Sequence, residues 1–168
     1  MGWYERAAVA IAGTRPGAWF FVNVASRLDR ILVPLTRGRL SSCLGTQYHG
    51  RHLLLLTTAG ARSGRRRTAP LLYVVDGERL VVIGSRGGHS RHPAWYHNLR
   101  ASPRATVYAR GTIGEYVARE AQGEERARLW ARAVELYPGY AAYREAAGPR
   151  KIPVIVLTPL HRADRDDA

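Results

Sequence analysis

Apolar side chains recur at every third or fourth position between residues 17 and 37, and arginines and Asp29 fall on the opposite side of the repeat. This spacing predicts an amphipathic helix, because residues three and four apart share one helix face. Pro34 is expected to kink or end that helix, since proline donates no backbone hydrogen bond. The apolar positions of this predicted helix are Phe20, Val24, Leu28, Ile31, Leu32 and Leu35.

From residue 53 onward the pattern changes to short apolar runs that are bounded by turn residues. LLLLTT at 53–58 predicts one strand, because a short apolar run of this kind is typical of a buried strand. PLLYVVDGERLVVIGS at 70–85 predicts a β-hairpin that Asp76 and Gly77 close, with Val, Ile and Leu on both arms.

Further along, ATVYARGTIGEYVAREA at 105–121 alternates between apolar and polar residues, which predicts two strands with Gly111 or Gly114 at the bend. KIPVIVLTP at 151–159 predicts a final strand. Two helices are expected between the strands. AWYHNLRA at 94–101 predicts a short one, and GEERARLWARAVELYP predicts a charged amphipathic helix that ends before Pro138. The inward side chains of the second helix are expected to be Leu129, Val134 and Leu136.

Five or six mostly antiparallel strands with flanking helices indicate an α+β domain built on a small closed barrel. With 168 residues, the chain is long enough for one well-buried core and too short for two comfortable domains. We expect an N-terminal helical extension over residues 1–44, the barrel domain over 45–160 and a solvated tail over 161–168.

Charge and cysteine content narrow the classes of function. The net charge is +13, and residues 51–110 contribute eleven arginines against Asp76 and Glu78. This clustering indicates an anionic partner, which is nucleic acid, lipid headgroups or an anionic small molecule. A general preference for Arg over Lys is the alternative for the total charge, because Lys151 is the only lysine. The lone Cys43, with no signal peptide or long apolar span, predicts a cytoplasmic protein.

Two glycine-bearing connections, TTAGARSGRRRTAP at 57–70 and SRGGHSRHP at 85–93, carry arginines at the ends of predicted strands. Glycines permit tight turns with exposed N–H groups, and arginine forks bind phosphate or carboxylate through charge-assisted hydrogen bonds. Two such loops on one barrel indicate an elongated anion. Neither loop matches the Walker or dinucleotide-binding fingerprint.

The motifs TTxGxxSG, SxGG, PxWYxNL, YPxYxxY and IPVxxLTP occur here together and in order, over residues 45–160. In this the chain resembles the deazaflavin-dependent nitroreductase and quinone reductase family of actinobacteria, whose members use coenzyme F-420. The resemblance implies a split β-barrel and hydride transfer from reduced F-420 to a quinone, a nitroaromatic or a similar acceptor. It also implies that the arginines hold the phosphodiester and the poly-glutamate tail of the cofactor.

The resemblance places the family's cofactor contacts on four segments of this chain. These are Arg62, Ser63, Arg67, Thr68, Ala69, Pro70, Leu71 and Leu72; then Ile83, Gly84, Ser85, Arg86 and Gly87; then Ala94, Trp95, Tyr96, His97 and Asn98; and Tyr140. Two positions depart from the family. Many relatives have a basic residue where Ala61 stands, for which Arg65 or Arg66 are candidate substitutes, and an aromatic residue is frequent at the position of Leu72.

Tyr137, Tyr140 and Tyr143 recur at intervals of three, near the predicted end of a helix, where the family places its acceptor contacts. Hydride delivery builds negative charge on an acceptor oxygen, which a phenol O–H stabilises or protonates. The three tyrosines are therefore the candidate catalytic residues. The alternative is that they only pack on the barrel.

Other patterns indicate less. His49 with His52 and His89 with His92 have a spacing seen in metal sites, but no acidic or cysteine companion, so we expect no metal. Ser63 lacks the GxSxG frame of a nucleophile. The predicted N-terminal helix either binds a membrane surface, which would make the protein peripheral on the inner face, or packs on the barrel.

Two other functions stay open from the residues alone. One is a basic small-barrel module that binds nucleic acid, although we expect no nucleic acid because the aromatic residues fall in helices. The other is the same fold with FMN or haem in place of F-420. The oligomeric state and the physiological acceptor are not predicted.

Overall fold

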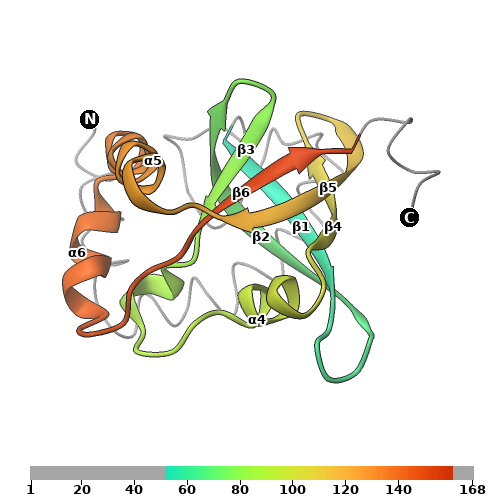
Figure 1. Ribbon diagram of the computed structural model, residues 1–168, viewed down its shortest axis with the longest axis horizontal. Coiled ribbons are helices and arrows are strands. Elements are labelled where there is room, and N and C mark those ends of the chain that lie inside the picture. Colours follow the sequence, from blue (N-terminus) through green and yellow to red (C-terminus); the bar gives the residue numbers. More distant parts are fainter. Residues whose placement is uncertain (1–51, 161–168) are drawn as a thin grey trace, which may run out of the picture.

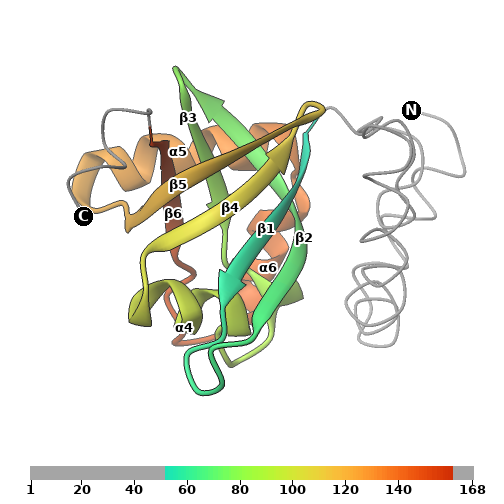
Figure 2. The same cartoon turned by 90° about the vertical axis from the view of Figure 1, so that its right-hand side faces the viewer.

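The computed structural model describes residues 52–160, in which six strands close into a barrel (Figures 1 and 2). The helix predicted over 17–37, the tail over 161–168, Cys43 and His49 lie outside the described residues. Strand order around the barrel is β1-β2-β3-β6-β5-β4, and every neighbouring pair is antiparallel, which confirms the predicted fold class. The strands are β1 (Leu53–Ala59), β2 (Arg66–Asp76), β3 (Arg79–Ile83), β4 (Arg104–Ala109), β5 (Thr112–Glu120) and β6 (Val154–Pro159).

Alternation of side chains along each strand separates a core inside the barrel from an apolar layer outside it. Leu54 and Leu56 of β1 point inward and are fully buried with Tyr73 of β2 and Val107 of β4. The outward side chains of β3 and β6, such as Val81, form a second core cluster beneath two helices. The barrel is therefore a filled core rather than a channel.

The helices are the 3₁₀ turn η2 (Arg86–Gly88), α4 (Ala94–Ala101), α5 (Gly123–Leu136) and α6 (Gly139–Ala146). The helix predicted to end before Pro138 is α5, which ends at Leu136 as expected. Helix α6, which starts directly after Pro138, was not predicted as a separate element. Of the expected inward side chains of α5, Leu129 is buried, and Val134 and Leu136 are half-buried and pack against the same core cluster.

The inward face of α5 is formed by Leu129, Trp130, Ala133 and the following Tyr137. These residues follow the i, i+4 spacing of one helix face, with Trp130 beside them. The second layer of the core therefore joins α5 directly to the tyrosine segment.

Strand direction places the three longer connections at one end of the barrel. Because neighbours are antiparallel all the way round, the connections β1–β2, β3–β4 and β5–β6 leave from the same end, and the hairpins β2–β3 and β4–β5 turn at the other. In Figure 1 the first end, with α4 and η2, is at the bottom. We call it the loop end.

The hairpin end has two tight turns. Gly77, at a φ of 64°, and Glu78 join β2 to β3, as the Asp76-Gly77 pattern predicts. Arg110 and Gly111, at φ of 52° and 81°, join β4 to β5, so Gly111 makes the bend and Gly114 lies within β5. Left-handed φ at Arg110 and Gly111, and at the first position of the other turn, Gly77, matches the strand twist of two-residue hairpins.

Candidate functional site at the loop end

The connection between β1 and β2 is a compact turn that presents its side chains to solvent. The N–H of Gly60 donates to the carbonyl of Arg65 at 2.9 Å, and the N–H of Gly64 donates to the carbonyl of Gly60 at 2.7 Å. Gly64 has a φ of 65°, a region that favours glycine. Arg62, Ser63 and Arg65 are exposed on this turn, as the sequence predicts for an anion-binding loop.

The two following arginines belong to β2 and not to the loop. The sequence pattern predicts this strand from Pro70, but it starts four residues earlier, at Arg66, because Arg66 pairs with Ala59 of β1. Arg66 donates to the hydroxyl of Thr106 on β4 at 2.9 Å, which holds its guanidinium against the outside of the barrel. Arg66 is thus a poorer substitute than Arg65 for the basic residue absent at position 61, because its guanidinium already binds Thr106, although Arg66 and Arg67 are both exposed.

Asn98 of α4 fixes the first loop from below. Its amide oxygen accepts from the N–H of Ala61 at 3.0 Å, and its amide nitrogen donates to the hydroxyl of Thr58 at 2.9 Å. Asn98 and Thr58 are both buried. The side chain of Asn98 therefore sets the position of the loop that carries Arg62 and Ser63.

The other predicted residues of α4 divide into buried and exposed ones. Trp95 packs into the core inside the barrel, and the hydroxyl of Tyr96, which is also buried, donates to Glu120 of β5 at 2.9 Å. Burial raises the pKa of Tyr96, and the hydrogen bond to Glu120 adds to the rise. Ala94 and His97 are exposed. Helix α4 thus acts first as a plug that anchors the loop end.

The connection after β3 contains three successive residues in the left-handed region: Arg86, Gly87 and Gly88 have φ of 48°, 61° and 76°. A Cβ at Gly88 would lie 2.7 Å from the Cβ of Ala146 and 3.1 Å from the carbonyl oxygen of Tyr143, so only glycine lets η2 approach α6 this closely. Arg86 is exposed on this turn.

Ile83, Gly84 and Ser85, which precede that turn, are buried. Gly84 packs against Pro153, and a Cβ there would come within 2.5 Å of the proline ring. Of the predicted contacts in this segment, Arg86 and the half-buried Gly87 are therefore the ones open to a ligand, while the three residues before them support the turn.

The three tyrosines meet at the junction of α5 and α6. The hydroxyls of Tyr137 and Tyr143 are 3.1 Å apart, and the rings of Tyr137 and Tyr140 meet edge to face with centroids 5.2 Å apart. Burial raises the pKa of both Tyr137 and Tyr143, so both phenols are protonated at neutral pH. Tyr140 is buried beside Trp130, and only Tyr143 is half-buried.

Gly139 allows this arrangement, which sequence analysis missed. A Cβ at Gly139 would lie 2.5 to 2.8 Å from the ring and hydroxyl oxygen of Tyr137, so the ring folds back over the glycine backbone. The YPGY pattern shows a glycine next to a helix start, but a helix start alone does not indicate that a ring lies over it.

The strand β2 joins the loops to the tyrosines. Thr68, Ala69, Pro70, Leu71 and Leu72 are all half-buried, as is the run 114–118 of β5. Leu72 packs against the cluster that contains the three tyrosines, and the hydroxyls of Thr68 and Thr57 are 2.8 Å apart. Ala69 and Leu71 pack against the core inside the barrel, so β2 connects the first loop to the tyrosine cluster through its outward side, where Leu72 lies.

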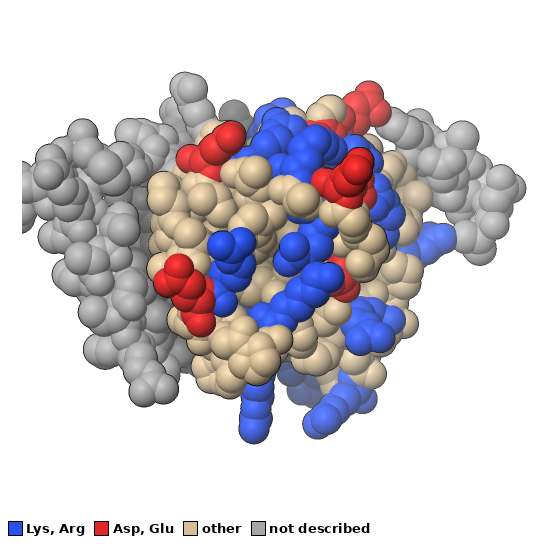
Figure 3. All heavy atoms as spheres, turned by 60° about the vertical axis from the view of Figure 1, so that its left-hand side comes forward, with Lys and Arg blue, Asp and Glu red and all other residues tan. Residues whose placement is uncertain are grey.

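The two arginine-bearing connections of the loop end hold no acid of their own, and Glu120, at the same end, accepts a hydrogen bond from Tyr96. Residues 59–75 and 84–110 contain no Asp or Glu. The arginines of these two stretches, apart from Arg110 at the hairpin end, are Arg62, Arg65, Arg66, Arg67, Arg86, Arg91, Arg100 and Arg104. Basic side chains project at the lower edge of Figure 3, whereas basic and acidic side chains are mixed higher on that face. The donor set suits a ligand with several negative charges.

Comparison with known proteins agrees with this geometry. The family model of the F420H(2)-dependent quinone reductases matches residues 30–159, nearly the whole barrel domain. The chain belongs to this family.

Relatives in the F420H(2)-dependent quinone reductase family cover most of the chain. The F420H(2)-dependent quinone reductase Rv1261c of Mycobacterium tuberculosis is 36% identical over 107 residues, which are 62% of this chain and 72% of that protein. Rv3178 of the same organism is 36% identical over 106 residues, 63% of this chain and 88% of its own length. The family resemblance seen in the motifs is confirmed.

Solved structures support the fold. The structure of an F420-H2 dependent reductase (FDR-A) has 40% identity and a TM-score of 0.59, covering 64% of this chain and 94% of that one. HutZ, the heme storage protein from Vibrio cholerae, has a TM-score of 0.51 at 17% identity, covering 66% and 83%. The second likeness concerns the fold alone.

Within residues 52–160, no group of three or more His, Cys, Asp or Glu side chains lies close enough to hold a metal ion. No helix in that part of the chain is long and apolar enough to cross a membrane.

Proposed function

We propose that this protein transfers hydride from reduced F-420 to a quinone, with nitroaromatics as further acceptors. The observation that carries the proposal is the convergence at the loop end. The two arginine-bearing turns lie at one end of the barrel. The half-buried part of β2 and the segment with the three tyrosines both connect to that end. The chain belongs to the F420H(2)-dependent quinone reductase family. The acceptor class follows from the family.

The residues present fit an anionic deazaflavin. Arg62, Arg65 and Arg67 on one side and Arg86 on the other offer exposed guanidinium groups to phosphate and carboxylate oxygens. The half-buried Thr68, Pro70 and Leu72, which lie on the outward side of β2, offer a surface for a flat ring system. When bound there, the reduced deazaflavin supplies the hydride, and the protein supplies binding, orientation and electrostatics.

Tyr143 is the residue that we assign to the acceptor. It is half-buried and lies against the same cluster as Leu72, next to the half-buried part of β2. Its raised pKa keeps its hydroxyl protonated, so it can donate a hydrogen bond to an oxygen on which negative charge builds. Tyr137 accepts or donates at the other side of that hydroxyl, and Tyr140 supports the pair from the core.

Position 61 indicates how this chain manages without the family's basic residue. Its N–H is bound by Asn98, so the backbone of the loop is fixed there whatever the side chain. The neighbouring Arg62 and Arg65 then supply the charge. At the other departure, Leu72 leaves more room beside Tyr143 than an aromatic ring would.

The test is an oxidation assay of reduced F-420 with a menaquinone analogue, a nitroimidazole and a nitroimidazooxazine as acceptors. We expect turnover with the quinone, and fluorescence anisotropy should show F-420 bound to the apo-protein. Absence of both binding and turnover would contradict the proposal. An absorption spectrum of the purified protein distinguishes FMN or haem, which absorb at other wavelengths, from the deazaflavin.

We further propose that the predicted N-terminal helix brings the enzyme to quinone at the inner face of the membrane. The support is the apolar stripe that includes Phe20 and Leu28, with Arg27 and Arg30 opposite. Cosedimentation with anionic vesicles should fall when Phe20 and Leu28 are both replaced by Glu. Unchanged cosedimentation would contradict this role.

A further inference from the structure

Arg150, which no part of the sequence pattern singles out, reaches from the segment after α6 to the second arginine-bearing connection. Its Nε donates to the carbonyl of His89 at 2.8 Å, one terminal nitrogen donates to the carbonyl of Gly84 at 3.0 Å, and the other donates to the carbonyl of Ser85 at 2.6 Å. The nitrogen that bonds Gly84 also lies 3.4 Å from Nδ1 of His92. One planar guanidinium thus binds four groups of a single loop.

These contacts bracket the left-handed turn. Gly84 and Ser85 precede Arg86, and His89 follows Gly88, so Arg150 fixes both ends of the stretch from 86 to 88. The left-handed backbone of Arg86 is unfavourable for a residue with a Cβ, and such conformations persist only where the surroundings hold them. The close approach of Gly88 to α6 holds the turn from another side.

The charge of Arg150 has no acidic counterpart among the described residues, because none of the five ion pairs between residues 52 and 160 includes it. Its partners are three neutral carbonyls and an imidazole. Burial and the nearby positive charge of Arg86 lower the pKa of Arg150, although a guanidinium remains protonated at neutral pH. Two cations therefore lie close together here.

We propose that Arg150 is a positioning residue for F-420 binding: its hydrogen bonds hold the turn that aims Arg86, and its own charge adds to the positive field at that point. The inference rests on the proposed function for the identity of the ligand. The statement that Arg150 holds the turn does not depend on the identity of the ligand.

Arg126 provides a matched control. It lies on α5 and donates to the carbonyl of Ile152 at 3.1 Å, two residues from Arg150, and its guanidinium lies 5.8 Å from the ring centroid of Trp130. Like Arg150, Arg126 binds a backbone carbonyl, in its case one of the connection between α6 and β6. Its hydrogen bond and its ring contact do not involve residues 84–92. Its loss should destabilise the fold without changing the turn.

The first measurement is amide hydrogen exchange of the apo-protein, which needs no cofactor. Arg150→Met should raise exchange over residues 84–92 at least tenfold, and Arg126→Met should leave that segment as in the wild type. Arg150→Lys keeps the charge but not the fork, so it should also raise exchange there. Wild-type exchange over 84–92 in both Arg150 variants would overturn the proposal. If Arg150→Met does not fold, Arg150→Lys decides.

The second measurement is affinity for F-420 by fluorescence anisotropy, together with steady-state kinetics. Arg150→Met should weaken binding at least tenfold and raise KM for reduced F-420 by a similar factor, with kcat at saturating cofactor within about threefold of wild type. Wild-type affinity in Arg150→Met would overturn the binding role. Failure of the wild type itself to bind F-420 would contradict the proposed function, while the exchange result would still test the turn.

Discussion

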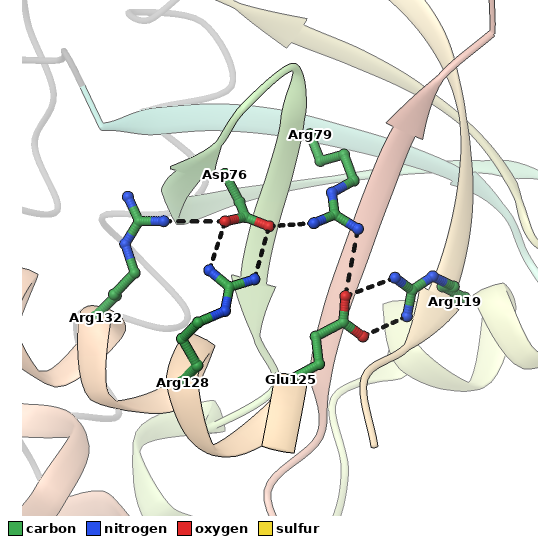
Figure 4. A network of polar contacts seen from close by, with 6 residues as sticks. All are labelled: Asp76, Arg79, Arg119, Glu125, Arg128 and Arg132. Carbon is green, nitrogen blue, oxygen red and sulfur yellow. Dashed lines mark hydrogen bonds and ion pairs between the residues drawn. The ribbon is translucent and has the colours of Figure 1, made fainter. Parts of the chain in front are cut away.

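Arginines on the flank covered by α5 and arginines at the loop end have different surroundings. On the flank, Asp76 binds Arg79, Arg128 and Arg132, and Glu125 binds Arg79 and Arg119, in one connected network (Figure 4). At the loop end, none of the described ion pairs involves an arginine of the two turns. The first set joins the β2–β3 hairpin to α5, and the second set leaves its charge open to a ligand.

The flank arginines lower the pKa values of the two acids that they bind. Hydrogen bonding and charge from Arg128, with Arg79 beside it, lower the pKa of Asp76 from 3.8 to about 2. The bidentate bond from Arg119, at 2.6 and 2.7 Å, lowers the pKa of Glu125. An arginine-rich sequence therefore does not by itself indicate binding. What indicates binding is a cluster of arginines from which acids are absent.

The largest expected effect comes from removing charge at the loop end. Arg62→Ala combined with Arg86→Ala should weaken F-420 binding about 100-fold or more, because each lost charge-assisted contact contributes about 1.5 to 3 kcal/mol. Anisotropy titration of the apo-protein measures it. Arg128→Ala with Arg132→Ala, which removes two arginines from the flank, is the matched control and should leave affinity unchanged. An equal loss of F-420 affinity in both double variants would contradict the difference between the loop end and the flank.

Removing the acid at the centre of the network tests the flank. Asp76→Asn should lower the free energy of unfolding by about 2 kcal/mol at pH 7, because it leaves three guanidinium groups near one another without a counter-charge. Urea denaturation measures it. Glu124→Gln, at an exposed position in the first turn of α5, is the control and should change stability far less.

The contribution of Asp76 to the free energy of unfolding should also depend on pH. The pKa of Asp76 is lower in the folded protein than in the unfolded chain, so its contribution is fully present above about pH 4 and is lost as pH falls toward 2. The stability gap between wild type and Asp76→Asn should therefore shrink between pH 4 and pH 2. A gap that does not shrink over this range would contradict the network.

A smaller effect is expected at the tyrosines. Tyr143→Phe should lower kcat with a quinone about tenfold, because the acceptor oxygen loses a hydrogen-bond donor, while KM for reduced F-420 stays within about twofold. Tyr108→Phe, on the outside of β4 beside Leu53 and Leu55, serves as the control. If the two variants have the same kcat, the tyrosine cluster only packs.

The smallest expected effect is that of salt. Raising ionic strength from about 50 mM to about 500 mM should weaken F-420 binding about fivefold, because exposed charges at the loop end are screened. Anisotropy titration at the two salt concentrations measures it. Affinity that does not change with salt would indicate that ring contacts along β2 dominate binding.

Much of the barrel could be predicted from the sequence, because the apolar runs and the glycine turns are local signals. The start of β2 at Arg66 could not, since it depends on pairing with Ala59 of another strand. The end of α5 before Pro138 could be predicted from the proline, whereas the bounds of α6 could not, because a helix of eight residues is too short to show a clear apolar repeat.

The candidate site was predicted through its motifs, and the roles of individual residues within it were not. Asn98 and Ser85 each belong to a motif that also contains exposed residues. Asn98 is nevertheless buried, and its side-chain amide is hydrogen-bonded through both its oxygen and its nitrogen. Ser85 accepts a hydrogen bond from Arg150 through its backbone carbonyl. Arg150 lies 65 residues from Ser85 in the chain, so only the fold brings them together. Long-range hydrogen bonds of this kind leave no mark in a local pattern.

The most direct test is a map of hydrogen exchange in the full chain with and without F-420. The arrangement at the loop end predicts that slowed exchange is confined, within residues 52–160, to the turns around 60–67 and 84–88, the half-buried part of β2 and the segment around 137–143. The hairpin at 110–113 and the flank helix α5 up to Arg132 should not change. Protection on that flank, or at the hairpin end and not at the two arginine turns, would contradict the assignment of the loop end as the site of the anionic redox carrier.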